Sequence, residues 1–183
     1  MKIVCVHGWH GQPEVFEPMA SALAQAFGDE VVTIDLAAYR TLDDAVTLDD
    51  LATAMMAAWQ AHQLPTVKGS VKLIVHSMGA LVMRCWLTRY FTPKTAPISH
   101  CVMLAPANFG SVLAHKGRAV LGRLFNGLHW MHPFEVGAPL LKSLELASTW
   151  TWKQAEKDCF EQVWFDQNHI LTTVILGDQG YSG

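Results

Sequence analysis

Residues 71–86 read VKLIVHSMGALVMRCW, and this stretch decides the fold. Its first part, Val71–Val75, is a short apolar run of the kind that forms a buried β-strand. Its second part, from Ala80 to Trp86, continues as an amphipathic helix, and Ser77 stands at the turn between them. A serine at such a turn points its hydroxyl out of the carboxyl edge of a sheet, beside the N–H groups of a helix start. These N–H groups favour a developing oxyanion, so the turn suits acyl transfer.

Two further strings are expected beside this turn. Residues 7–11 read HGWHG and follow the apolar run Ile3–Val6, so the N–H group of Trp9 can stand near Ser77 once the two strands are neighbours. Residues 105–111 read APANFGS and follow another apolar run. We expect the N–H groups of Trp9 and Met78 to form an oxyanion hole, and the residues that shape its turns to include His7, Gly8, Gly11 and Gly79.

With these three strings the chain resembles the α/β-hydrolase superfamily. Within it, the chain is similar to lipase-like serine esterases, which include bacterial triacylglycerol lipases and glycosylphosphatidylinositol deacylases. The string APANFGS looks like the Thr-Pro-His-x-Gly-Ser segment of many such lipases. The resemblance also implies that His76 helps to shape the turn at Ser77 and takes no part in proton transfer. The family pattern around the nucleophile is G-x-S-x-G, and here Val75 replaces the first glycine, so we expect the turn to open slightly.

The resemblance covers most of the chain and implies an α/β fold. It implies a mostly parallel sheet with helices on both faces and a helical lid, and a serine carboxylic-ester hydrolase in which Ser77 forms an acyl-enzyme. The apolar runs agree, because strands that are apolar throughout are buried on both faces, as in parallel sheets. We expect strands near residues 3–6, 31–36, 71–75, 101–104 and 171–176.

Three helical stripes are expected to face the core. The first precedes Gly28 and consists of Phe16, Met19, Ala20, Leu23 and Phe27. The second follows a Thr47 cap and consists of Leu48, Leu51, Ala52, Met55 and Trp59. The third consists of Met78, Leu81, Val82, Cys85 and Trp86, and its helix is expected to direct Arg84 and Thr88 outward. With 183 residues and 51% apolar composition, the chain fits one domain, residues 1–183.

Residues 108–169 form an insertion within that domain, because far more chain separates two strands here than a crossover requires. Two interpretations are open. The insertion is a lid or acyl-binding cap over the active site, or it is a helical pair that packs on the sheet. The first predicts an apolar acyl-ester substrate and transient contact with a lipid surface. The expected substrate-binding face consists of Leu121, Leu124, Phe125 and Leu128.

The acid and the histidine that would complete a catalytic triad with Ser77 are harder to identify in the sequence. The family order is serine, then acid, then histidine. Asp178 follows the last expected strand and is the candidate acid, but no histidine follows it. His169 precedes that strand, so we expect it at the opposite edge of the sheet from Ser77. Two hypotheses follow: an enzyme whose domain is incomplete at its C-terminus, or a non-catalytic hydrolase-like binding or interaction module.

Other classes of protein are disfavoured. A net charge of −3 without a basic cluster argues against nucleic-acid binding, and the absence of a P-loop or G-x-G-x-x-G string argues against nucleotide cofactors. The H-x-x-H spacings at residues 7–10 and 129–132 lack the Glu and third ligand of a metal site. No run reaches transmembrane length and none resembles a signal sequence, so we expect a cytoplasmic protein. We expect buried core thiols at Cys5, Cys85, Cys101 and Cys159.

Overall fold

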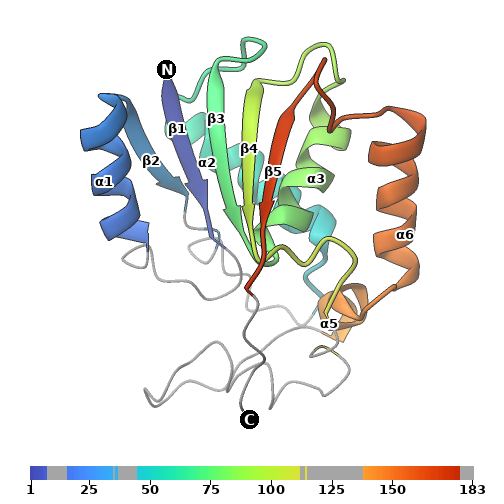
Figure 1. Ribbon diagram of the computed structural model, residues 1–183. Helices are drawn as coiled ribbons and strands as arrows, with labels where there is room; N and C mark the ends of the chain where they lie inside the picture. Colours follow the sequence, from blue (N-terminus) through green and yellow to red (C-terminus); the bar gives the residue numbers. More distant parts are fainter. Residues whose placement is uncertain (8–15, 35, 37–44, 112–113, 115–137, 178–183) are drawn as a thin grey trace, which may run out of the picture.

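Five parallel strands form one sheet in the order β2-β1-β3-β4-β5. The computed structural model describes residues 1–7, 16–34, 36, 45–111, 114 and 138–177 (Figure 1). The strands are β1 (Lys2–Val6), β2 (Glu30–Ile34), β3 (Val71–His76), β4 (Ile98–Leu104) and β5 (Leu171–Ile175). The predicted α/β fold with a parallel sheet is therefore confirmed, and each expected strand is present with ends shifted by up to three residues.

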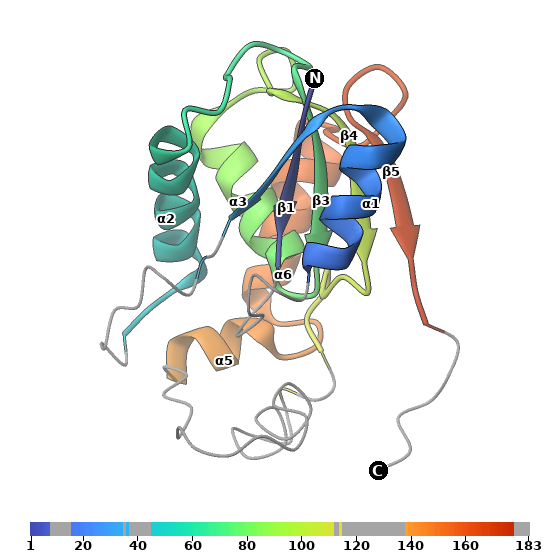
Figure 2. The same ribbon diagram turned by 90° about the vertical axis from the view of Figure 1, so that its left-hand side faces the viewer.

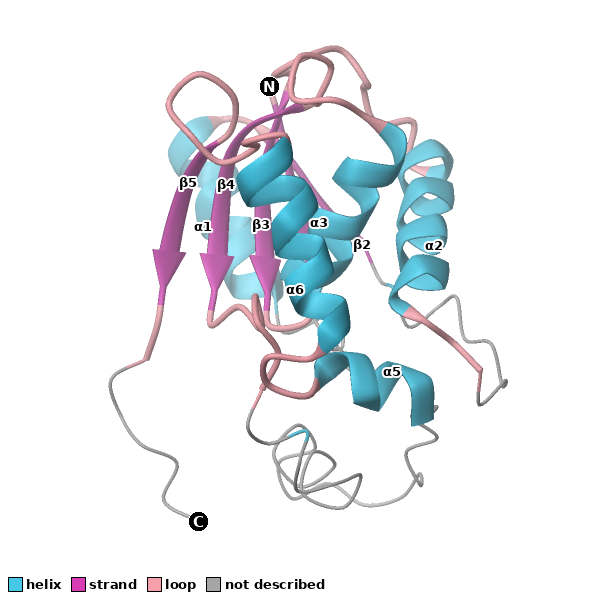
Figure 3. Cartoon of the chain, turned by 90° about the vertical axis from the view of Figure 1, so that its right-hand side faces the viewer, coloured by secondary structure: helices cyan, strands magenta, loops and turns pink. Residues whose placement is uncertain are grey.

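Helices cover both faces of the sheet. One face carries α1 (Glu17–Phe27), and the other carries α2 (Leu48–Ala61), α3 (Gly79–Tyr90) and α6 (Thr149–Ala155), which continues into the π-helical turn η4 (Glu156–Glu161) (Figures 2 and 3). The short helix α5 (Ala138–Leu144) lies at the end of the molecule toward which the strands point (Figure 3). Among the described residues, no helix has both the length and the apolar composition needed to cross a bilayer.

The larger part of the core lies between the sheet and α2 and α3. Helix α3 is buried on nearly all sides, so its sequence is apolar almost throughout. Its Trp86 packs on Trp59 of α2, with ring centroids 4.7 Å apart. A smaller cluster under α1 contains Phe16 and the sheet residue Ile74. The sheet and α3 therefore form a fixed unit, which holds the turn between β3 and α3 in place.

Local sequence explains where α2 begins and where α1 ends. The side chain of Thr47 accepts a hydrogen bond from the Asp50 N–H at 3.2 Å, and the Asp50 carboxylate accepts one from the Thr47 N–H at 2.9 Å. This reciprocal capping box confirms the predicted start of α2. Gly28 ends α1 in the left-handed conformation, with φ of 66°.

Several side chains do not lie where their spacing predicts. Arg84 is only 2% exposed, although we expected it to face outward, because it meets a buried carboxylate contributed by η4. Phe27 is 62% exposed, because it is the last residue of α1. Cys159 is exposed, so the prediction of a core thiol is wrong there, whereas Cys5, Cys85 and Cys101 are buried as predicted.

The edge at which the strands begin is polar. Lys2 of β1 pairs with Glu30 of β2 at 3.0 Å, and Lys72 of β3 lies 3.5 Å from Asp29. Because the strands are parallel, all five deliver their carboxyl ends to the opposite edge, where Ser77 follows β3.

Candidate active site

Ser77 lies at the turn between β3 and α3, and its backbone is in the left-handed region with φ of +54°. A residue other than glycine rarely adopts this conformation, which costs about 1–3 kcal/mol and persists where the surroundings enforce it. Such strain is typical of a nucleophile held on a sharp strand-to-helix turn.

Backbone hydrogen bonds from the segment after β4 hold this turn. The Ser77 N–H donates to the carbonyl oxygen of Leu104 at 3.0 Å, and the Ser77 carbonyl accepts from the Ala107 N–H at 3.1 Å. The Ala80 N–H in the first turn of α3 also donates to the Ser77 carbonyl, at 3.2 Å. The string at residues 105–111 therefore reaches the nucleophile turn.

The end of β1 lies against the same turn. Strands β1 and β3 are neighbours, with Val6 opposite Val75. A Cβ atom at Gly79 would lie 3.0 Å from the carbonyl oxygen of Val6 and 3.1 Å from that of His7, so a larger residue here would require the end of β1 to shift by a few tenths of an ångström. The structure thus brings the segment that begins at His7 beside the start of α3.

Met78, one of the two expected oxyanion donors, stands at the start of α3. It is the N-cap of α3, and its N–H group precedes the ladder of hydrogen bonds within the helix. Its side chain is buried in the larger core cluster. The other expected oxyanion donor, Trp9, lies outside the described residues, as do Gly8 and Gly11.

Val75, which replaces the first glycine of the family pattern, is fully buried. Its side chain belongs to the core cluster beneath α2 and α3, together with Leu73 on the same face of β3. It is paired with Val6 on one side and Met103 on the other. The position is therefore a packing site as well as part of the turn.

Two histidines stand at this edge of the sheet. Burial lowers the pKa of His76, and the charge of nearby His7 lowers it further. The imidazole of His76 is therefore neutral at neutral pH. His7 is itself buried, with its ring 6.1 Å from that of Phe16. Their role in shaping the turn stays a prediction.

His169 lies at the opposite edge, as its position before β5 predicts. Its Nδ1 is 2.8 Å from the Asp166 carboxylate. It cannot serve Ser77 as a base from there. The candidate acid Asp178 lies outside the described residues, as do Leu121, Leu124, Phe125 and Leu128. Among the described residues, no group of three His, Cys, Asp or Glu side chains could hold a metal ion.

A buried ion pair near the site was not predicted from the sequence. The guanidinium of Arg84 in α3 pairs with the carboxylate of Asp158, which lies 74 residues further along the chain, and also donates to the carbonyl oxygen of Asn108. The sequence carries one signal for this, an arginine inside an otherwise apolar helix. Nothing in the sequence identifies its partner.

Comparison with known proteins places these features in a wider group. A model described as the alpha/beta hydrolase family matches residues 3–174. A search of curated proteins finds no match. Among solved structures, phospholipase PlaB from Legionella pneumophila is 27% identical with a TM-score of 0.74, and the match covers 97% of this chain and 39% of that one. The chain thus spans about two-fifths of the length of that phospholipase.

Two less similar structures share the fold. A bromoperoxidase from Bacillus anthracis is 16% identical with a TM-score of 0.62, and the match covers 97% of this chain and 73% of that one. Lipase BlEst2 from Bacillus licheniformis is 18% identical with a TM-score of 0.52, and the match covers 87% of this chain and 59% of that one.

Proposed function

The chain belongs to the alpha/beta hydrolase family, and from this premise we propose that it is a serine carboxylic-ester hydrolase of the lipase or esterase type. The observation that carries the proposal is the strained backbone of Ser77 at the carboxyl edge of the sheet, with φ of +54°. The neighbouring end of β1 and the segment after β4 support it, because both pack on this turn.

In the proposed reaction, the Ser77 hydroxyl attacks the acyl carbonyl of an ester while a general base takes its proton, and the base then returns this proton to the departing alcohol. The N–H groups of Met78 and Trp9 stabilise the negative charge of the tetrahedral intermediate. The alcohol then leaves, and water hydrolyses the resulting acyl-enzyme. Asp178 is our candidate for the acid that orients the general base. His169 is excluded as that base because it lies at the opposite edge of the sheet.

We further propose that the acyl group is apolar. The phospholipase that is 27% identical supports a lipid ester, although the present chain spans 39% of it. The composition of residues 121–128 supports the same conclusion, since the spacing of Leu121, Leu124, Phe125 and Leu128 predicts an apolar face on a helix. We assign to this part of the insertion at residues 108–169 the role of a lid that binds the acyl chain and touches a lipid surface.

The test is active-site labelling of the full-length protein with a fluorophosphonate probe, beside hydrolysis of a short p-nitrophenyl ester. Ser77→Ala should abolish labelling and lower turnover by about a million-fold, as removal of a triad serine does. Ser99→Ala is the matched control, because Ser99 lies near the opposite edge and its hydroxyl donates to the Val71 carbonyl. Labelling that survives Ser77→Ala would overturn the proposal, and a wild-type protein that neither labels nor hydrolyses would favour a non-catalytic binding module.

A further inference from the structure

A buried ion pair joins the helix that follows Ser77 to the insertion. Arg84 of α3 and Asp158 of η4 are 2% and 0% exposed. The guanidinium donates through Nε to one carboxylate oxygen at 2.7 Å and through Nη2 to the other at 2.9 Å. This two-pronged geometry is the strongest that an arginine and a carboxylate form, and it fixes the plane of the guanidinium.

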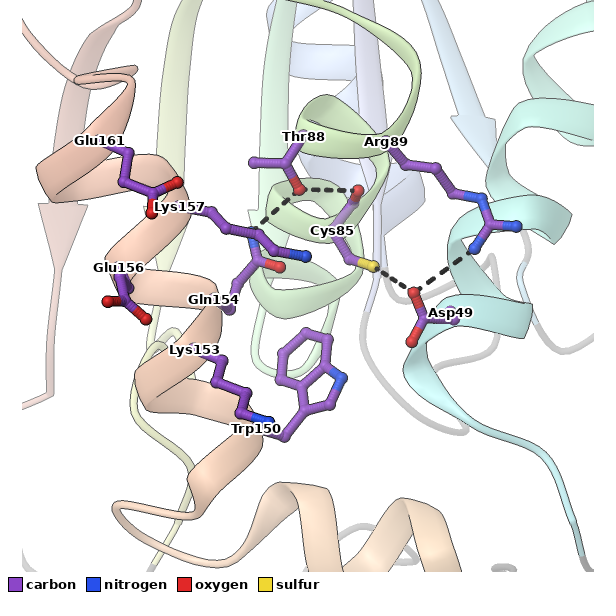
Figure 4. Close-up of a pocket in the computed structure, with 10 residues that line it drawn as sticks. All are labelled: Asp49, Cys85, Thr88, Arg89, Trp150, Lys153, Gln154, Glu156, Lys157 and Glu161. Atoms are coloured by element: carbon purple, nitrogen blue, oxygen red, sulfur yellow. Dashed lines mark hydrogen bonds and ion pairs between the residues drawn. The ribbon is translucent and has the colours of Figure 1, made fainter.

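The carboxylate is held in turn by its own neighbours. The Gln154 side-chain amide donates to Asp158 at 3.0 Å and to the Thr88 hydroxyl at 3.2 Å, and the Cys159 thiol donates to Asp158 at 3.2 Å. Figure 4 shows Gln154 reaching from α6 toward Thr88, one turn beyond Arg84 on α3. Asp158 is therefore locked onto α3 and cannot move independently of Arg84.

The remaining arm of the guanidinium points to the segment that holds the nucleophile. Nη1 of Arg84 donates to the carbonyl oxygen of Asn108 at 2.6 Å. The preceding residue, Ala107, is the one whose N–H bonds the Ser77 carbonyl. The Phe109 ring lies 5.9 Å from the guanidinium and packs against Trp152. Arg84 and Ser77 therefore contact two adjacent residues, Asn108 and Ala107.

We propose that Arg84, oriented by Asp158, is a positioning residue that keeps the segment 105–110 against Ser77 and so maintains the reactive geometry of the serine. The inference rests on the proposed function of Ser77. If the Arg84 contact is lost, the segment can shift, and the Ser77 carbonyl then loses the Ala107 N–H that helps to keep its backbone at positive φ. The serine hydroxyl would be misplaced relative to the oxyanion donors.

The alternative is that the ion pair only stabilises the fold. The two roles can be separated, because replacing both partners of a buried pair with apolar residues is often neutral for stability, whereas removing one partner leaves an uncompensated charge and destabilises strongly. The double variant Arg84→Met with Asp158→Leu keeps the fold and loses the bond to Asn108. The single variant Asp158→Asn weakens the fold and keeps Arg84 in reach of Asn108.

The experiment measures melting temperature, the rate of fluorophosphonate labelling, and kcat and KM for a short p-nitrophenyl ester on the full-length protein. The double variant should be the more stable of the two and the less active, with kcat lower by about 10²-fold, the typical effect of a small misplacement. KM should change little, because the lost interaction matters in the transition state. Met55→Ala, a buried residue of α2 outside this network, is the control for destabilisation alone and should retain the wild-type kcat below its melting temperature.

The proposal would be overturned if kcat falls in step with melting temperature across the double variant, Asp158→Asn and Met55→Ala. A double variant with the wild-type kcat would also overturn it. If the double variant does not fold, Arg84→Lys decides, because an ammonium group keeps the charge but lacks the fork that bridges Asp158 and Asn108. A wild-type kcat for Arg84→Lys would then overturn it. Failure of the proposed function looks different, since the wild-type protein itself would not label at Ser77.

Discussion

Gly79 and Val6 approach each other so closely that a Cβ atom on Gly79 would lie 3.0 Å from the Val6 carbonyl oxygen. The contact joins the first turn of α3 to the end of β1, two segments that are more than seventy residues apart in the sequence. Since the atoms involved are backbone atoms, the contact cannot be relieved by a side-chain rotation. The close approach of α3 to the end of β1 is therefore favoured by the absence of a side chain at position 79.

Gly79→Ala should disturb both stability and reactivity. An added methyl group would require the end of β1 to shift by a few tenths of an ångström, and overpacking in a well-packed region costs typically about 1–3 kcal/mol. Urea unfolding and the fluorophosphonate labelling rate measure the two effects. Gly177→Ala is the control, because a Cβ at Gly177 meets nothing within 4 Å. A Gly79→Ala protein that labels at the wild-type rate would show that the approach of β1 does not matter for the reaction.

Val75→Gly should destabilise the protein although it restores the glycine of the family pattern. Val75 is fully buried in the main core cluster, and the loss of a buried valine together with the added flexibility of glycine costs about 3 kcal/mol. Equilibrium unfolding in urea measures the change. Val75→Ala separates the two contributions, since it removes most of the side chain without adding backbone freedom. Unchanged stability of the glycine variant would mean that the core repacks at this position.

His76 should make the protein less stable as the pH falls through its ordinary pKa of 6.5. Burial and the charge of His7 lower its pKa in the folded state, so the unfolded chain binds the proton more readily. The contribution of neutral His76 is therefore complete above about pH 6.5 and is lost progressively below it. Urea unfolding between pH 5 and 8 measures this slope, and His76→Gln should flatten it. An identical slope in the variant would assign the effect to other groups.

Leu124→Ser combined with Phe125→Ser should impair long-chain esters more than acetate esters. Each methylene of an acyl chain that the proposed lid would bury is worth about 0.8 kcal/mol, so the loss should grow with chain length. Values of kcat/KM for p-nitrophenyl esters of increasing length test this, with Lys116→Ser as a control for a polar change in the same segment. Equal impairment of short and long esters would favour the interpretation that this part of the insertion packs on the sheet.

The sequence predicted the sheet and the strand-to-helix turn at Ser77 because both depend on local patterns. Val71–His76 is apolar enough to identify a buried strand, and Ser77 follows it at a spacing that admits a strand-to-helix turn. The carboxyl ends of β1 and β3 could also be expected to meet, since neighbouring parallel strands end at one edge.

Long-range polar contacts could not be predicted in the same way. Helical periodicity places a charged residue outward by default, and the pairing of Arg84 with Asp158 depends on how an insertion folds back onto α3. The bond from Ala107 to the Ser77 carbonyl likewise depends on the course of the loop after β4, which periodicity does not describe. Charges inside apolar helices are therefore the positions at which such a prediction most needs structural information.

The polar edge where the strands begin, with Lys2 beside Glu30 and Lys72 near Asp29, offers a place to attach a reporter without touching the chemistry. A strand of five or six residues spans roughly 17–20 Å, so a dye or a solid support linked at Glu30 would stand that far from Ser77. An immobilised protein would present the edge that carries Ser77 to a vesicle or an emulsion droplet. The parallel arrangement of the strands thus makes one edge available for attachment and leaves the edge that carries Ser77 unmodified.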